Sequence, residues 1–397
     1  MTCRQLWLCL LVSAPLACAD GAYIPPEYGT AESADQRACI IDHGATQTLI
    51  IETAYEGDLS DFAWVIPLPT LIQAADIGTV SQDLFRALED LTAPRAWVAP
   101  GGAVATGGCG GCGGGTQFAG APGDGRNQLG VTVWETLTLE GYEVVILSAT
   151  QSADLAQWLE DNGYELPDGN EDTLQYYVDA GAFFVAVRVA PDQTAPAQMN
   201  GLGTTGALEP LRLTFPKGPD GLVFPLRISR ASSKDETEVR LFVIDEHRVK
   251  SESYPTAQVN ALGYDGVQDF AQWYDARFRA GLAGLGGRGF LVEYARPLPE
   301  WWAPEDLQGL LGEGDLFLTR LRSYLDPAQM TEDVLLACAP SDEEFVVDIV
   351  VGAQLAARGY VSLSALLLAG VWSLRARSRR ARTGARLTAL LGLLLLL

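Results

Sequence analysis

The sequence predicts an α+β protein: an exported body of mixed antiparallel sheet and helices, followed by a C-terminal transmembrane helix. Runs of β-branched and aromatic residues come in clusters, and amphipathic helical segments separate these clusters instead of following every strand. Hydrophobic segments at both ends predict export and anchoring. With 397 residues, 48% of them hydrophobic and 19% charged, the chain is long enough to bury a large core.

The first 19 residues have the pattern of a secretory signal peptide. Arg4 precedes the apolar run LWLCLLV, and Ala17-Cys18-Ala19 supplies small residues for cleavage. Lipidation of Cys18 is an alternative, but Leu16 lies one position too close to that cysteine for the usual lipobox. We therefore expect residues 1–19 to be removed and residues 20–345 to form an extracytoplasmic domain.

The most recognisable segment of the body is DFAWVIPLPT, Asp61–Thr70. Large and small apolar residues alternate in it, so a strand here has two buried faces, and Pro67 and Pro69 end that strand. Thr46–Tyr55 is an earlier β-branched run, and the residues Glu56–Asp58 between the two runs are typical of a turn. The two runs are therefore predicted to form a hairpin.

The remaining elements follow from the two periodicities of helices and strands. Helices are expected at Ser81–Leu91, Ser152–Asn162, Glu171–Asp179, Gln268–Arg279 and Leu316–Leu325. Strands are expected at Thr132–Leu137 and Tyr142–Leu147, as a second hairpin, and at Phe183–Val189, Leu211–Phe215, Leu222–Ile228, Glu238–Ile244 and Phe290–Tyr294. Residues 101–127 are dominated by glycine and are expected to be a flexible insertion.

Four cysteines remain after the signal peptide, and an even count in an exported chain favours disulfides. Four cysteines permit three connectivities, of which we favour Cys109 with Cys112 and Cys39 with Cys338. Redox chemistry and a zinc site are the alternatives. Redox chemistry is disfavoured because glycines flank Cys109 and Cys112, whereas a reactive thiolate is usually stabilised by a helix N-terminus. A zinc site is disfavoured because it needs a second close pair of ligands.

The charge of the body argues against nucleic acid as a partner. The chain carries 50 acidic and 27 basic residues, for a net charge of −23. All the acidic residues lie between residues 20 and 352, whereas Arg4 and seven arginines fall outside that range, so the exported body is more acidic than the whole chain. Such a surface repels phosphate backbones, and its simplest role is solubility.

The C-terminal region predicts a single membrane anchor over residues 349–374. The apolar residues of this region are enough to cross a bilayer when Ile349–Val351 is included. The following segment, residues 375–397, begins with six arginines and no acid, so the positive-inside rule places it in the cytoplasm and the body outside. Its last 11 residues, LTALLGLLLLL, are too short to return across the bilayer as a helix and are expected to be interfacial or part of a processed sorting tail.

Catalytic and cofactor motifs are missing from the sequence or stand in the wrong context. Three GxGxxG matches, beginning at Gly108, Gly201 and Gly284, do not connect a strand to a helix, so no nucleotide cofactor is expected. No GxSxG or HExxH motif is present. The two histidines, His43 and His247, each adjoin acidic residues, which leaves open a metal site but more simply indicates solvated ion pairs.

The tryptophan pair Trp301–Trp302 stands between Pro299 and Pro304. Two adjacent indoles are suited to an exposed platform for a sugar or a peptide. Packing of both rings against the body is the simpler interpretation.

Several segments in order resemble the bacterial domain-of-unknown-function family 2330. They are ADQRACI, YEGDLSDFAWVIPLP, LFRALEDLTAPR, ADLAQWLEDNGY, LQYYVDAGAFFVAVRV, LRLTFP, GLVFPLRIS and LTRLRSYLDPAQMTEDV, and together they span most of Ala34–Val334. The resemblance implies an exported, often membrane-anchored protein without an established activity, so it assigns no catalytic residue. This chain departs from the family by lacking a cysteine-glycine cluster at its mature N-terminus.

We therefore expect a non-enzymatic binding or structural module of the cell envelope, held in the membrane with its main domain outside the cytoplasm. Its expected partners are the lipid bilayer and an envelope protein or polymer. Two alternatives stay open: an envelope hydrolase in which His43 and His247 hold a metal, and an accessory subunit of an envelope complex.

Overall fold

The computed structural model describes residues 22–24, 36–56, 63–98, 126–128, 130–139, 142–162, 171–189, 205–231, 233, 236–299, 301–302, 304–312 and 314–351. The chain divides into two compact units. The first unit comprises residues 1–94, 111–260 and 275–347, and the second comprises residues 95–110, 261–274 and 348–397. Each unit is described by itself.

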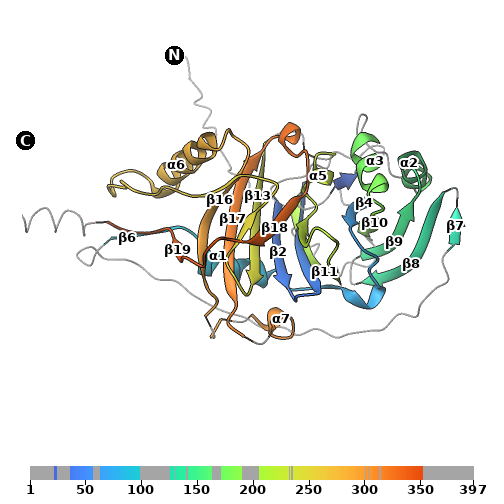
Figure 1. Ribbon diagram of the computed structural model, residues 1–397, viewed down its shortest axis with the longest axis horizontal. Coiled ribbons are helices and arrows are strands. Elements are labelled where there is room, and N and C mark those ends of the chain that lie inside the picture. The colour runs from blue at the N-terminus through green and yellow to red at the C-terminus, as the bar shows by residue number, and fades with distance from the viewer. Residues whose placement is uncertain are drawn as a thin grey trace, which may run out of the picture. The chain divides into compact units, whose positions relative to one another are not determined.

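A nine-stranded mixed sheet is the largest element of the first unit (Figure 1). Its strands follow the order β15 (Thr256–Gln258), β16 (Phe290–Pro297), β17 (Phe317–Leu325), β13 (Thr237–Asp245), β2 (Gln36–Asp42), β3 (Thr46–Glu56), β11 (Thr205–Pro216) and β5 (Ile77–Thr79), with β19 (Phe345–Val346) also paired to β16. The pairs β2–β13 and β15–β16 are parallel, and the others are antiparallel.

Two smaller sheets complete the strand structure of this unit. The six-stranded antiparallel sheet has the order β1 (Ala22–Ile24), β4 (Ala63–Leu68), β10 (Phe183–Val189), β9 (Tyr142–Ala149), β8 (Val131–Leu139) and β7 (Arg126–Gln128). The three-stranded sheet has the order β12 (Leu222–Phe224), β18 (Val334–Cys338) and β14 (Val249–Ser251).

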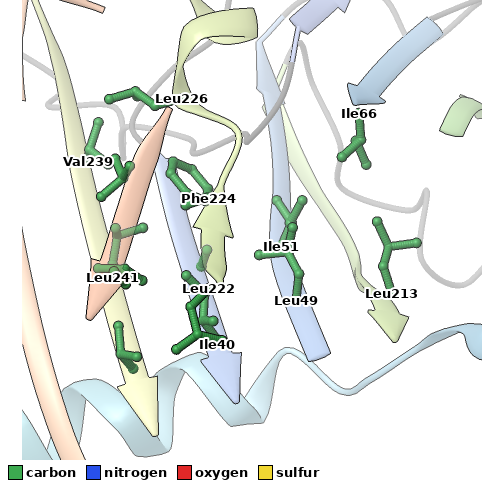
Figure 2. Close-up of a cluster of buried hydrophobic side chains, with 14 of the residues drawn as sticks. Ile40, Leu49, Ile51, Ile66, Leu213, Leu222, Phe224, Leu226, Val239 and Leu241 are labelled. Carbon is green, nitrogen blue, oxygen red and sulfur yellow. The ribbon is translucent and has the colours of Figure 1, made fainter. Parts of the chain in front are cut away.

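The main hydrophobic core is shared by these three sheets. Figure 2 shows Ile40 and Leu49 of the large sheet beside Leu222 of the three-stranded sheet, and Ile66 of the six-stranded sheet near Leu213 of β11. All of these side chains are almost fully buried. In the central strands of the six- and nine-stranded sheets, alternate residues point into this core, and the other face packs against a second layer.

Short amphipathic helices cover those second faces. Helices α2 (Ser152–Asp161) and α3 (Glu171–Asp179) pack on the six-stranded sheet, together with Ile228 of α5 (Leu226–Ser229). Helices α1 (Asp83–Thr92) and α7 (Glu305–Gln308) pack on the nine-stranded sheet. The 3-10 helices η1 (Ala74–Asp76) and η2 (Pro327–Gln329) lie in connections.

The second unit is small. Strands β6 (Arg95–Val98) and β20 (Asp348–Val351) pair in parallel, and residues 261–274 belong to the same unit. Helix α6 spans Phe270–Gly284, and its first residues belong to this unit. The rings of Tyr264 and Trp273 lie 4.9 Å apart, measured between ring centroids.

No helix within the described ranges is long and apolar enough to cross a bilayer. The first residues of the predicted anchor, Ile349–Val351, lie in strand β20 and not in a helix. The rest of that segment, the signal peptide and the glycine-rich insertion 101–125 lie outside the described residues.

The α+β class and most of the expected elements are confirmed. Helices α1, α2, α3 and α6 and strands β8, β9, β10, β13 and β16 lie where the sequence predicts them, within a few residues at their ends. The hairpin between Thr132–Leu137 and Tyr142–Leu147 is also confirmed, because β8 and β9 are antiparallel neighbours.

Three expectations about strands and helices are wrong. The strands β3 and β4 do not form a hairpin, because both edges of β3 are taken by β2 and β11, and both edges of β4 by β1 and β10. Leu222–Ile228 is a three-residue strand followed by a helical turn. The predicted helix Leu316–Leu325 is the interior strand β17.

Candidate functional site

A row of charged side chains crosses the face of the nine-stranded sheet on which α1 packs. Phe242 and Ile244 of β13 contact the apolar side of α1. On the same face of β13, Arg240 lies two residues before Phe242, and Glu238 lies two residues before Arg240. The neighbouring strand β17 carries Arg320 and Arg322 on this face, where the backbone register pairs Arg240 with Arg322. The strand alternation therefore gathers arginines under a helix instead of exposing them to solvent.

Glu89 of α1 connects the helix to both strands. One carboxylate oxygen pairs with the Arg240 guanidinium, and the other lies 2.8 Å from Nη1 of Arg320. Nη1 of Arg320 also donates to Oγ1 of Thr92, one turn further along α1. Burial raises the pKa of Glu89, but Arg320 and Arg240 outweigh that effect, so the net pKa is lowered and the carboxylate stays charged.

Glu293 supplies the second carboxylate of the row. It lies at a β-bulge, where the register of β16 against β17 shifts between Val292 and Tyr294. A bulge changes the direction of a side chain, and here Glu293 is fully buried beside two arginines. Its carboxylate lies 2.7 Å from Nε of Arg320 and 3.3 Å from Nη1 of Arg322.

Glu238 completes the row by pairing with Arg240 and, at 2.8 Å, with Nη2 of Arg322. A nearby pair joins Arg37 of β2 to Glu52 of β3 at 2.6 Å. We call these eight residues the Arg–Glu network: Arg37, Glu52, Glu89, Glu238, Arg240, Glu293, Arg320 and Arg322.

The Arg–Glu network balances four guanidinium groups against four carboxylates. A buried ion needs an opposite charge and hydrogen bonds to offset its lost hydration, and each member faces at least one such partner. The paired charges cross-link α1, β13, β16 and β17, so the network fixes the helix on the sheet at one register. Sequence reasoning missed it, although Glu238 and Arg240, like Arg320 and Arg322, stand two residues apart in apolar runs.

The two histidines follow the C-terminal ends of the parallel neighbouring strands β2 and β13, but they have different partners. Nε2 of His43 lies 2.9 Å from Oγ1 of Thr48, and burial lowers the pKa of the imidazole. Nδ1 of the exposed His247 lies 2.9 Å from the Asp342 carboxylate, and this hydrogen bond raises its pKa. In the part of the chain that the structure describes, no group of three or more His, Cys, Asp or Glu side chains is placed to hold a metal ion.

The cysteines whose surroundings are described are separate thiols. Cys39 is fully buried in the layer under α1, and burial raises its pKa to about 12. Cys338 is exposed at the end of β18, in a different sheet. The structure therefore does not make the expected Cys39–Cys338 bond. Cys109 and Cys112 lie outside the described residues, so their pairing stays a prediction.

A second polar junction joins α3, α5 and the start of β18. One oxygen of the Asp333 carboxyl accepts hydrogen bonds from the Tyr177 hydroxyl at 2.5 Å and from the backbone N–H of Arg227 at 3.0 Å. The Tyr177 oxygen in turn accepts from the N–H of Ile228. Burial raises the pKa of Asp333 to about 6, even though both hydrogen bonds lower it.

The tryptophan pair is divided between core and solvent. Trp302 is 8% exposed and packs in the layer under α1, and its backbone N–H donates to the carbonyl of Pro299 at 2.8 Å. Trp301 is 79% exposed. The expectation that both rings pack against the body is thus correct for Trp302 and wrong for Trp301, whose indole stands in solvent on a turn held by its buried neighbour.

Comparison with known proteins identifies a family and distantly similar solved structures. The family described as "Uncharacterized protein conserved in bacteria (DUF2330)" matches residues 14–337. None of the curated proteins matches. A 2.7 Å crystal structure of a mutated baculovirus P35 after caspase cleavage is similar over 77% of this chain and 99% of that chain, at 9% identity and a TM-score of 0.30. A similarity at that level supports no inference about fold or function.

Proposed function

We propose that this chain, which belongs to the DUF2330 family of uncharacterized bacterial proteins, is a membrane-anchored envelope protein that binds an envelope polymer or protein through Trp301. The signal-like residues 1–19 support export. The apolar tail that follows Val351, with six arginines from residue 375 onward, supports anchoring in the membrane with the body outside the cytoplasm.

The exposed indole of Trp301 is the observation that carries the binding part of the proposal. A tryptophan buries 150–250 Å² when it packs, so leaving it 79% exposed gives up a large favourable contribution to folding. The ring is also presented on a fixed support, because its neighbour Trp302 is anchored in the core. Exposed tryptophans on rigid supports are typical of surfaces that contact an apolar ring, a sugar face or a peptide.

The acidic body narrows the class of partner. The chain carries a net charge of −23, and its body is more acidic than that. Long-range repulsion then disfavours polyanions, whereas neutral polysaccharides and basic or neutral proteins meet no such barrier. Contact through an aromatic ring fits these neutral or basic partners.

Crosslinking from intact cells tests this function. We expect the full-length wild-type chain to crosslink to a stoichiometric envelope partner, or to sediment with envelope polymer. Trp301→Ala should reduce that association several-fold while leaving the thermal unfolding midpoint unchanged, since the ring contributes little buried area. Trp134→Ala is the matched control, because Trp134 is also partly exposed, at 40%, but lies on β8 of another sheet.

Two results would contradict the proposal. Equal association of the wild type and Trp301→Ala would remove the assigned contact. A loss of association in both the Trp301 and Trp134 variants would show that the effect is not specific to the exposed indole.

A further inference from the structure

The loop before α6 carries two of the most exposed large apolar side chains in the described ranges. Val267 is 85% exposed and Leu262 is 76% exposed. Single exposed aliphatic residues are common on protein surfaces. Two such residues on one short loop, each with most of its side chain in water, are less common and call for a physical account.

Hydrogen bonds, ring contacts and glycine conformations fix the shape of this loop. Gly263 and Gly266 adopt positive φ angles of 92° and 78°, which side-chain-bearing residues rarely adopt. The N–H of Val267 donates to the Asp265 carboxylate at 3.0 Å. The Tyr264 hydroxyl donates to the carbonyl of Gln268 at 2.7 Å. These bonds hold residues 264–268 in one conformation, which lowers the ordering cost of presenting Val267 to a partner.

Aromatic rings form the base of the loop. The ring of Tyr264 lies 5.3 Å from that of Phe270 and 4.9 Å from that of Trp273, measured between centroids. Phe270 and Trp273 are themselves 6.2 Å apart and nearly parallel. Exposed aliphatic residues beside the partly exposed ring of Tyr264 suit a lipid interface, because tyrosine favours the headgroup level, whereas the buried Trp273 supports the loop from inside.

The loop belongs to the same compact unit as the strand that leads to the predicted anchor. Residues 261–274 and strand β20 are both in the second unit, and β20 ends at Val351. The apolar tail of the sequence follows directly. A tail that enters the membrane therefore holds this unit close to the lipid surface. Contact of the loop with lipid then becomes an intramolecular event, which favours even a weak interaction.

We propose that Leu262 and Val267 insert into the lipid surface beside the anchor, so that the loop is a second contact between the body and the membrane. This inference rests on the proposed anchoring. The loop carries Asp265 and Asp269 and no basic residue between Asn260 and Tyr274. The lipid it suits is therefore zwitterionic, because an anionic headgroup would repel these carboxylates.

Lipid photolabelling of the full-length protein tests the inference. The wild type is reconstituted in phosphatidylcholine vesicles that contain a phospholipid with a diazirine in its acyl chain, irradiated, and digested with trypsin. Cleavage sites in the sequence give three diagnostic peptides: Ser251–Arg277 with the loop, Gly359–Arg375 from the tail, and Gly289–Arg320 with the exposed Trp301. The third peptide is the internal control, because Trp301 is as exposed as Leu262 but belongs to the first unit.

We expect label on Ser251–Arg277 and Gly359–Arg375 and several-fold less on Gly289–Arg320. The double variant Leu262→Ser with Val267→Ser should lose most of the loop label and keep the tail label, and both residues are exposed, so the fold should be unaffected. Tail label without loop label would overturn this inference and leave the anchoring intact. Absence of label from both peptides would overturn the anchoring and the inference together.

Two further outcomes also contradict the inference. Loop label that persists in the double variant would show that the two aliphatic side chains do not make the contact. A loop that stays unlabelled by lipid but crosslinks to a protein in intact cells would assign this surface to a protein partner.

Discussion

Glu89 is the residue on which the Arg–Glu network depends most directly, because its two oxygens meet arginines from two different strands. Glu89→Gln keeps the size of the side chain and removes its charge. We expect the free energy of unfolding to fall by about 3–5 kcal/mol, the usual cost of leaving buried charges without their partner. Urea denaturation monitored by tryptophan fluorescence measures the change.

The matched control for Glu89 lies on the same helix. Asp83 pairs with Arg86, but both side chains are exposed, so Asp83→Asn should cost less than about 1 kcal/mol. If Glu89→Gln were no more destabilising than this control, the network would not hold α1 on the sheet.

Asp333 should make the stability of the protein depend on pH. Its pKa is about 6 in the folded state, against about 3.9 for an unfolded aspartate. The folded state therefore binds the proton more tightly than the unfolded state. The resulting contribution of Asp333 to the free energy of unfolding is complete below about pH 4 and is lost as the pH rises through about 6. Relative to Asp333→Asn, the wild type should lose up to about 3 kcal/mol of unfolding free energy between pH 4 and pH 7.

A second variant shows whether the hydroxyl of Tyr177 sets the pH range over which this stability is lost. Tyr177→Phe removes a hydrogen bond that lowers the pKa of Asp333, so the loss of stability should extend to higher pH. Urea unfolding at a series of pH values follows both variants. A wild type and an Asp333→Asn variant with parallel pH profiles would show that Asp333 does not titrate in this way.

At the scale of elements, the junction of β15 and β16 depends on one glycine. A Cβ on Gly289 would lie 2.7 Å from the carbonyl oxygen of Pro255, which accepts the N–H of Phe290 at 2.8 Å. Gly289→Ala must therefore separate the two strands, and we expect a loss of about 1–3 kcal/mol in unfolding free energy.

The control for Gly289 is Gly284 at the end of α6. A Cβ at Gly284 meets no atom within 4 Å, so Gly284→Ala should be neutral or slightly stabilising. Thermal unfolding of the two variants checks the difference. A Gly289→Ala protein that unfolds at the wild-type temperature would show that the strands tolerate the extra atom.

The sequence predicts an element correctly when its apolar residues share one face that packs on one layer. It predicts an element incorrectly when charged residues are buried. Helix α1 is predictable because Leu84, Phe85 and Leu88 share one face. Strand β17 is mistaken for a helix because Arg320 and Arg322 resemble a solvated face, whereas carboxylates from α1, β13 and β16 neutralise them. Those carboxylates lie up to 231 residues away in the chain, so local periodicity does not reveal them.

The pairing of strands is the second feature of the fold that the sequence does not predict. The runs that form β3 and β4 are identified as strands, but a turn between neighbouring runs does not specify that they pair. Each strand instead has both of its edges occupied in a different sheet. The exposure of Trp301 is the less favoured of the two sequence interpretations, because its apolar character alone favours packing.

In the proposed arrangement of the whole chain, an acidic α+β body is held outside the cytoplasmic membrane by its C-terminal tail. The family match covers residues 14–337, so it includes the body and not the tail. The proposed topology rests on the signal-like residues 1–19 and on the apolar, arginine-containing C-terminal segment.

Protease treatment of intact spheroplasts tests this topology most directly, with one epitope tag at the C-terminus and antibodies against the body. Protease added outside should digest the body and leave a small membrane-bound fragment that carries the C-terminal tag. A body that resists digestion until the cells are lysed, or a full-length chain recovered in the soluble cytosolic fraction with residues 1–19 still attached, would contradict this topology.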